Sequence, residues 1–238
     1  MLSVKPWRTD AVIFFIAVQG ICLFLGAGVV GLLQKAGVNG FKELDDLGSL
    51  VLSTMSFQGV TWILMFAFFR YHNVRWQDEL GFNKPSLLRP LLLACGTVVV
   101  ILLVAFPLQQ LSIVLMEKVG WKPEDEMAVS LLLNATSRAA GIYLGFFAVV
   151  LAPVAEEFIF RGVLFPYIKQ LGFPKLAWIG LSLVFALIHG DAAIFIPLFA
   201  LSLALTYLYE KTDCLLAPIF AHALFNAVNL VLIKFLPQ

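Results

Sequence analysis

Charge is scarce in this sequence. Only 13% of its 238 residues are charged, whereas 61% are apolar, and the mean hydropathy is +0.94. Soluble globular domains carry about 25% charged and about 45–50% apolar residues. The scarcity excludes an ordinary soluble enzyme and a disordered chain. Because a membrane-spanning helix needs about 20 residues, the sequence predicts an all-α fold, a polytopic transmembrane helical bundle.

An excess of one charge sign is missing as well, and so is a cysteine framework. The 16 basic and 15 acidic residues leave a net charge of +1, without the basic surface that binding to nucleic acid requires. The three cysteines, Cys22, Cys95 and Cys214, form no CxxC pair. A disulfide scaffold and a zinc knuckle are therefore excluded, and we interpret the cysteines as small buried hydrophobic residues.

Long apolar runs separated by charged loops are what the sequence does contain. Seven runs are expected to span the bilayer: Ala11–Leu33, Leu50–Phe69, Leu91–Met116, Ala139–Ile168, Leu176–His189, Ala192–Tyr209 and Leu215–Ile233. Uncertain boundaries allow six to eight. Pro107 should kink the third run, and Pro153 should kink or divide the fourth. The short run Met127–Ser137 is expected to be an interfacial or re-entrant helix.

No soluble domain or internal repeat interrupts these runs, so residues 1–238 form one integral membrane domain, with 139–233 as its functional core. With the N-terminus in the cytoplasm, nine basic residues fall in inside segments and six in outside ones. This excess favours a cytoplasmic N-terminus, and we expect a multi-pass protein of the plasma membrane.

Three charged residues break the pattern, because Glu156, Glu157 and Arg161 lie inside an apolar run. One ionisable side chain at the centre of a membrane helix costs about 2.5–3.5 kcal/mol even on the mildest scale. Glu157 and Arg161 are spaced i, i+4 with the acid first, which favours an ion pair. Glu156 points about 100° away around the helix. A purely structural ion pair is the plain alternative.

Two further motifs with polar residues lie downstream. His189 closes the fifth run four residues after Phe185, and His222 and Asn226 lie one turn apart in the last run. Each alone is accounted for by capping or by bonds between helices. Burying these polar side chains and the glutamates within the membrane costs least free energy if they form hydrogen bonds with one another. We therefore expect one polar pocket within the membrane.

Such a pocket suits hydrolysis of an amide. Glu156 and His189 could activate a water molecule, and His222 and Asn226 could stabilise an oxyanion. No GxSxG or histidine-adjacent cysteine offers a nucleophile. The alternative is a zinc site with Glu156, His189 and His222 as three ligands, but HExxH is absent and we expect no cofactor.

The motifs EExxxR at Glu156–Arg161, FxxxH at Phe185–His189 and HxxxN at His222–Asn226 follow one another in this order. Together they resemble the motifs of the CPBP (Abi) family, the group of CAAX prenyl proteases type II and bacteriocin-processing intramembrane proteases. The resemblance covers Gly141 to Leu230. It implies a glutamate-dependent intramembrane endopeptidase, in which Glu156 and His189 activate water, His222 and Asn226 form the oxyanion site, and Glu157 and Arg161 hold the site together, with Phe185 in support.

The implied partners are the lipid bilayer and a membrane-associated or lipidated peptide or protein. Whether the substrate is prenylated stays open, as does the oligomeric state. Two other functions stay open as well. A non-catalytic scaffold or immunity protein could keep the same fold, although it would not need His189 opposite Glu156. A proton-coupled transporter could use Glu156 and the histidines as a relay, although the inverted repeat typical of transporters is not found.

Overall fold

The computed structural model describes residues 2–37, 48, 51, 54, 58–121 and 138–235, and in these residues the regular structure is helical throughout. This confirms the all-α prediction. The elements, with η for a π-helical stretch, are α1 Thr9–Lys35, α3 Val60–His72, α4 Trp76–Glu79, α5 Leu88–Lys118, α7 Arg138–Phe146, η2 Phe147–Leu151, α8 Ala152–Glu157, η3 Phe158–Leu164, α9 Phe165–Gln170, η4 Leu176–Gly180, α10 Leu181–Ile188, α11 Ala192–Thr212 and α12 Leu216–Phe235.

Four of the described helices are long and apolar enough to cross a membrane: Leu88–Lys118, Gly141–Gln170, Ala192–Thr212 and Leu216–Ile233. Two further apolar helices, Thr9–Cys22 and Leu176–Ile188, are shorter. The chain is therefore an integral membrane protein with a helical bundle, while the number of seven spans stays a prediction. The run Met127–Ser137 lies outside the described residues.

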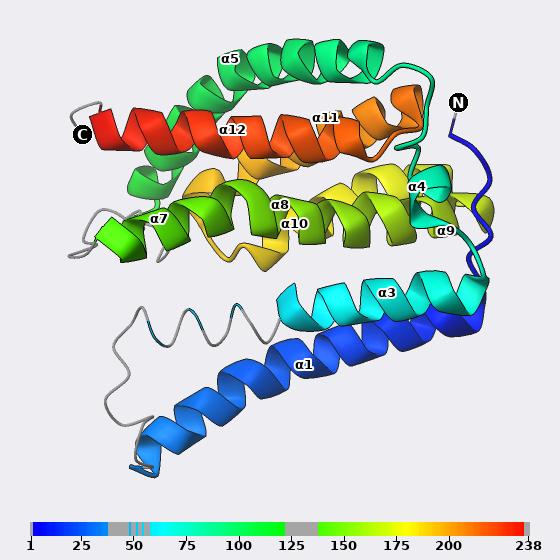
Figure 1. Cartoon of the computed structure of the whole chain (residues 1–238). Coiled ribbons are helices and arrows are strands. Elements are labelled where there is room, and N and C mark those ends of the chain that lie inside the picture. The colour runs from blue at the N-terminus through cyan, green and yellow to red at the C-terminus, as the bar shows by residue number, and fades with distance from the viewer. Residues whose placement is uncertain are drawn as a thin grey trace.

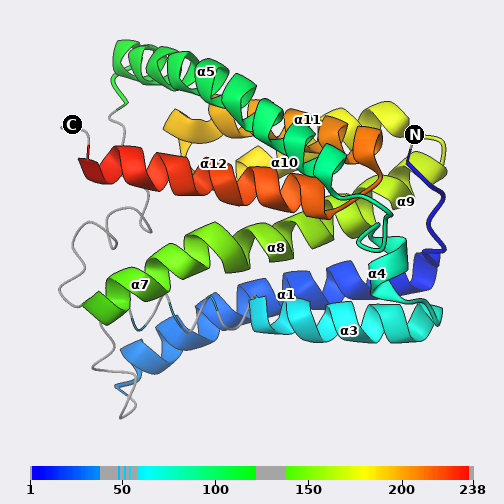
Figure 2. The same cartoon turned by 45° about the horizontal axis from the view of Figure 1, so that its top comes forward.

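Successive long helices from α5 to α12 run in roughly opposite directions, and the helices stack in layers (Figures 1 and 2). Helix α5 covers α11 and α12, and these pack in turn against α10 and the long helix that contains α8. The pair α1 and α3 lies on the opposite side of the long helix from α5 (Figure 2). The long helix is therefore held between two layers of helices.

This long helix is continuous from α7 to α9 although it contains Pro153 and Pro166. A proline inside a helix has no N–H to donate, and its ring collides with the carbonyl one turn back. Each proline follows a π-helical stretch, η2 or η3, in which the hydrogen bonds reach back five residues instead of four. The wider turns make room for both rings, so Pro153 does not divide the helix. Helix α5 likewise continues through Pro107 and bends toward its C-terminal end (Figure 1).

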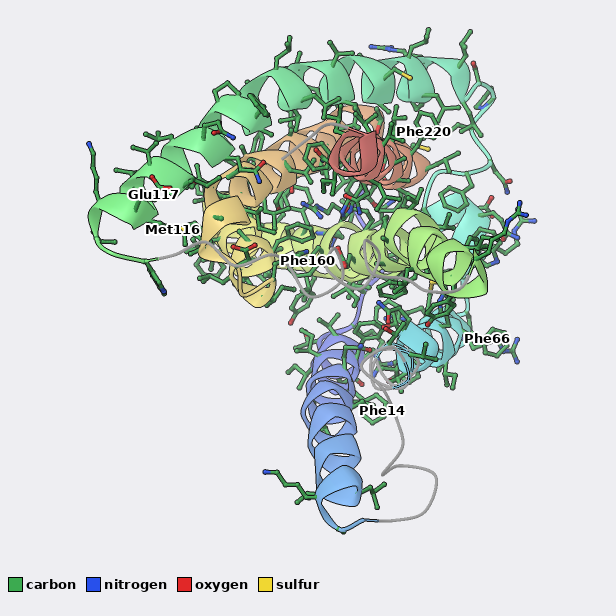
Figure 3. The ribbon with its side chains drawn as sticks, turned by 90° about the vertical axis from the view of Figure 1, so that its left-hand side faces the viewer. Phe14, Phe66, Met116, Glu117, Phe160 and Phe220 are labelled. Carbon is green, nitrogen blue, oxygen red and sulfur yellow. The ribbon has the colours of Figure 1, made fainter. Side chains whose placement is uncertain are left out.

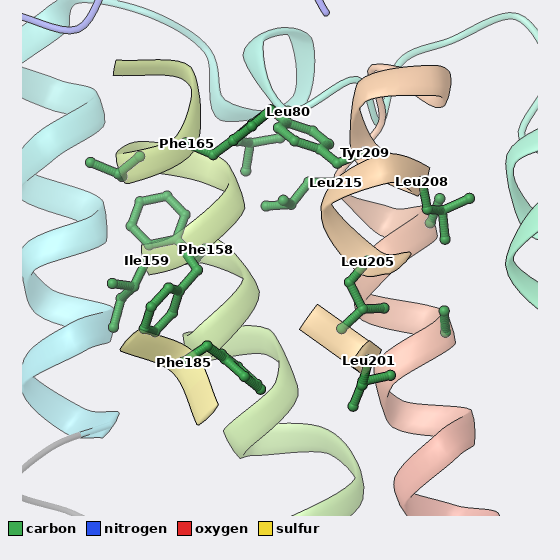
Figure 4. Close-up of a cluster of buried hydrophobic side chains, with 14 of the residues drawn as sticks. Leu80, Phe158, Ile159, Phe165, Phe185, Leu201, Leu205, Leu208, Tyr209 and Leu215 are labelled. Carbon is green, nitrogen blue, oxygen red and sulfur yellow. The ribbon is translucent and has the colours of Figure 1, made fainter. Parts of the chain in front are cut away.

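Buried apolar side chains of α8–α9, α10 and α11 meet in the centre of the bundle (Figure 4). Phe185 and Leu205 are fully buried there. Phe158 links this core to the α1–α3 pair, because its ring lies 5.8 Å from Phe15 and 5.6 Å from Phe69 between centroids.

The outer faces of the helices are apolar, as a lipid environment requires. Phe14 and Phe66 project from the α1–α3 pair, whereas Phe160 lies inside the bundle (Figure 3). The interpretation of all three cysteines as buried holds for Cys214 but is wrong for Cys22, which is half-buried on α1, and for Cys95, which is exposed on α5. A thiol is apolar enough to face lipid, so its position in an apolar run did not require burial within the protein.

Candidate active site

The centre of the site is the buried ion pair of Glu157 and Arg161. Arg161 Nη1 donates to Glu157 Oε1 at 2.8 Å, and the side chains of Arg161 and Glu157 are 2% and 0% exposed respectively. The two residues lie on either side of the junction of α8 and η3. The pairing predicted from the i, i+4 spacing is present in the structure.

Helix α11 holds the guanidinium from the other side. Arg161 Nη2 donates to the Ser202 carbonyl at 2.9 Å and to its hydroxyl at 2.6 Å, and Nε donates to the Thr206 hydroxyl at 3.3 Å. The Phe185 ring lies 5.0 Å from the guanidinium carbon. Sequence reasoning missed Ser202 and Thr206. Their signal was two hydroxyls spaced i, i+4 inside an apolar span, on one face of that helix.

His222 of α12 lies between the two glutamates. Its Nδ1 is 2.9 Å from Glu157 Oε1, and its Nε2 is 3.9 Å from Glu156 Oε2. Because a carboxylate accepts hydrogen bonds, Nδ1 is the donor in the shorter contact. The side chain of His222 is 3% exposed and that of Glu156 is 17% exposed. The adjacent carboxylates thus differ in environment, since only Glu156 remains accessible.

One oxygen of Glu157 has no partner in the part of the chain that the structure describes. Its Oε1 binds both Arg161 and His222, whereas its Oε2 is buried without a hydrogen bond. A buried acceptor left unpaired is costly. Glu157 Oε2 is therefore a strong hydrogen-bond acceptor beside the His222 imidazole that no described residue uses.

His189 belongs to the same neighbourhood but makes a different contact. Its Nδ1 lies 2.7 Å from the Phe185 carbonyl of its own helix. The Phe185 ring lies 4.8 Å from the His189 ring and 5.7 Å from the His222 ring, and so adjoins both imidazoles. Between the described side chains of His189 and Glu156 the structure has no hydrogen bond or ion pair. The structure thus brings Glu156 to His222 and leaves His189 beyond Phe185.

Asn226 contacts the long helix rather than a charged group. Its amide Nδ2 donates to the Ala148 carbonyl at 2.9 Å. In η2 the Ala152 N–H reaches the Phe147 carbonyl, five residues back. The next donor in this series would be residue 153, which is proline and has no N–H. Asn226 therefore supplies a hydrogen bond that Pro153 cannot make.

A groove of about 430 Å³ adjoins His189. It is lined from both sides of the histidine, by Ala186 and Leu187 before it and by Gly190 and Asp191 after it, and by Ser112 and Met116 at the end of α5. Most of this lining is apolar. The groove has the size of a ligand site and lies at the end of the helix that carries His189.

Among the described residues, no three His, Cys, Asp or Glu side chains are grouped so that they could hold a metal ion. The residues Glu156, His189 and His222 are accordingly not grouped in this way.

Residues 138–228 match a family model described as Rce1-like, type II CAAX prenyl endopeptidase. All seven residues singled out in the sequence lie in the matched segment. No curated protein and no solved structure matches the chain.

Proposed function

We propose that the protein is an intramembrane endopeptidase that hydrolyses a peptide bond with a water molecule activated at Glu156, because residues 138–228 match the model of the Rce1-like type II CAAX prenyl endopeptidases. The observation that carries the proposal is the position of His222, whose two nitrogens face two adjacent glutamates. The family implies protease activity of the CAAX type. The roles of the single residues are our proposal.

Glu156 is the general base. A base must reach the water that it deprotonates, and of the two carboxylates only Glu156 is partly accessible, at 17% against 0%. Glu157 is already bound to Arg161 and His222. Adjacent carboxylates in different environments divide the work between them, so Glu156 reacts and Glu157 holds the imidazole.

His222 and Asn226 stabilise the oxyanion of the tetrahedral intermediate. With both nitrogens protonated, His222 donates from Nδ1 to Glu157 and from Nε2 toward the reacting centre. The charges of Glu156, Glu157, Arg161 and His222 then sum to zero, which reduces the cost of burying them. Asn226 uses one of its two amide protons on the Ala148 carbonyl and has the second for the oxyanion.

His189 assists at the water. A carbonyl only accepts, so the contact with the Phe185 carbonyl puts a proton on Nδ1 and leaves Nε2 of the neutral ring as an acceptor. His189 and Glu156 make no direct hydrogen bond in the described structure, and the water molecule is the proposed link between them.

The substrate is a membrane-associated or lipidated peptide or protein. The groove beside His189 is mostly apolar and opens at the end of a helix, which suits an apolar chain that arrives from the bilayer. The protein works in the plasma membrane, with its N-terminus in the cytoplasm. No cofactor is needed for this mechanism.

The test is cleavage of a panel of quenched membrane peptides, prenylated and unprenylated, by purified protein in detergent. We expect Glu156→Gln to lower the rate by at least about 100-fold, because the base is lost. The matched control is Glu210→Gln, since Glu210 is 19% exposed and pairs with Lys169 outside the site; it should retain the wild-type rate.

Two results would contradict the proposal. If wild type cleaves no peptide of a broad panel, the peptidase proposal is contradicted and the scaffold and transporter alternatives remain. If a chelator abolishes cleavage and zinc restores it, the alternative of a zinc site replaces the glutamate mechanism.

A further inference from the structure

The segment before α1 lies across one end of the bundle (Figure 1). The Lys5 backbone N–H donates to Gln170 Oε1 at 2.8 Å, and the Lys5 ammonium donates to the Glu79 carbonyl and pairs with Asp213. Lys5 is only 4% exposed. The segment is therefore fixed to the end of α9, to α4 and to the turn between α11 and α12.

Trp7 is the other buried residue of this segment. It is 7% exposed, and its ring lies 5.0 Å from Phe68 and 5.9 Å from Phe69 between centroids. Its indole Nε1–H donates to the Gly162 carbonyl at 2.8 Å. The residue thus joins the N-terminus to the long helix, 155 residues further along the chain.

The accepting carbonyl of Gly162 receives no α-helical bond from its own helix. An α-helical bond to Gly162 would come from residue 166, and this residue is proline. In η3 the Phe165 N–H reaches back five residues to the Phe160 carbonyl, and Pro166 then ends the series. Within the membrane an unpaired carbonyl is costly, so the Trp7 donor stabilises the wide turn in place of the missing N–H.

This turn carries a charged residue of the site. Gly162 directly follows Arg161, whose guanidinium binds Glu157, and Glu157 binds His222. A change in the turn around Gly162 shifts the Cα of Arg161 and so the whole chain of contacts. Arg161 has little freedom to compensate, because Ser202 and Thr206 fix its guanidinium.

We propose that Trp7 is a positioning residue of the endopeptidase site: its indole N–H replaces the bond that Pro166 cannot make and so sets the position of Arg161, Glu157 and His222. The inference rests on the proposed function for its effect on catalysis. The hydrogen bond itself is independent of that function. The competing explanation is that Trp7 only packs against Phe68 and Phe69.

Two substitutions distinguish these explanations. Trp7→Phe keeps an aromatic ring but removes the donor. Pro166→Ala restores a backbone N–H at the position that can bond to the Gly162 carbonyl from within the helix. If the hydrogen bond from Trp7 to the Gly162 carbonyl positions the site, Pro166→Ala compensates for Trp7→Phe. The effects of the two substitutions on kcat and Tm are then not additive. If Trp7 only packs, they are additive.

The experiment measures kcat, KM and thermal unfolding in detergent for the wild type, both single variants and the double variant. We expect Trp7→Phe to lower kcat about tenfold with KM within about twofold, because a small displacement of the site affects the reacting groups more than substrate binding. In the Pro166→Ala background we expect the same change to lower kcat by less than about threefold. The shift in Tm should shrink in parallel.

Trp178→Phe is the matched control. Its indole N–H also donates to a backbone carbonyl, that of Leu203, at 3.1 Å, so the same kind of bond is lost. Pro166→Ala has no carbonyl to restore there, and its effect should add to that of Trp178→Phe.

Additive effects of Trp7→Phe and Pro166→Ala on kcat would overturn the proposal, as would a loss that falls on KM alone. If wild type cleaves nothing, the proposed function fails. The cycle of Tm values then decides whether Trp7 fixes the turn, and additivity in Tm would overturn this as well.

Discussion

At the scale of single residues, Arg161 donates more hydrogen bonds within the site than any other charged side chain there. It binds Glu157 of its own helix and Ser202 and Thr206 of α11, and it is fully buried. A planar guanidinium with five N–H donors suits such a set of partners. Lysine, with one ammonium, cannot reach them all at once.

We predict that Arg161→Met destabilises the protein by about 3–5 kcal/mol, because it leaves the buried charge of Glu157 without its cation. Unfolding in detergent, followed by denaturant titration, measures the change. The control is Arg75→Met, which breaks the exposed pair of Arg75 and Asp78 and should leave unfolding unaltered. Equal effects of the two substitutions would show that burial does not decide the strength of these pairs.

The sequence allowed the Glu157–Arg161 pair to be predicted, because an i, i+4 contact depends only on the helix that carries it. Ser202 and Thr206 could not be predicted as its partners, since that contact depends on which face of α11 turns toward η3. For the same reason the spacing within each motif could not show that His222, rather than His189, lies next to Glu156.

At the scale of elements, prolines interrupt the backbone hydrogen bonds of the long helix from α7 to α9 in two places. Near each proline, a side chain from another part of the chain donates a hydrogen bond to a backbone carbonyl of this helix. Asn226 donates to the Ala148 carbonyl before Pro153, and Trp7 donates to the Gly162 carbonyl before Pro166. The residues that carry the charges lie between these two places. The apolar run predicted the length of this helix. The π-helical turns could not be predicted, because a proline alone is equally consistent with a kink or a break.

We predict that Asn226→Leu lowers both stability and cleavage, because it removes a donor from the Ala148 carbonyl and one from the oxyanion. In a Pro153→Ala background the restored backbone N–H of residue 153 donates to the Ala148 carbonyl instead of Asn226. Thermal unfolding should then become nearly insensitive to Asn226→Leu, while kcat stays lowered at least about tenfold by the missing oxyanion donor. Full recovery of kcat in that background would show that Asn226 only supports the helix.

At the scale of the whole molecule, the ends of the helices divide into two sets. The N-terminal segment, α4, the end of α9 and the turn between α11 and α12 lie at one end of the bundle (Figure 1). Basic residues of this end include Lys5, Lys84 and Lys169. Basic residues are enriched on the cytoplasmic side of membrane proteins, which supports the proposed orientation.

We predict that a membrane-impermeant maleimide labels Val119→Cys on intact cells and labels Val4→Cys only after the cells are opened. Both positions are exposed, at 75% and 83%, and lie near opposite ends of the bundle. Cys22 and Cys95 are replaced by alanine for this experiment. Cys214 stays, because burial raises the pKa of its thiol and so lowers its reactivity. The reverse labelling pattern would place the N-terminus outside.

Trp7 and Asn226 both donate hydrogen bonds to backbone carbonyls of the long helix, and they lie far apart in the sequence. During synthesis the helix with the glutamates is made before α12, because it precedes α12 in the sequence. Until then the Ala148 carbonyl has no Asn226, and the carboxylates have no His222. The proposed peptidase site is therefore complete only when α12 has packed against the long helix.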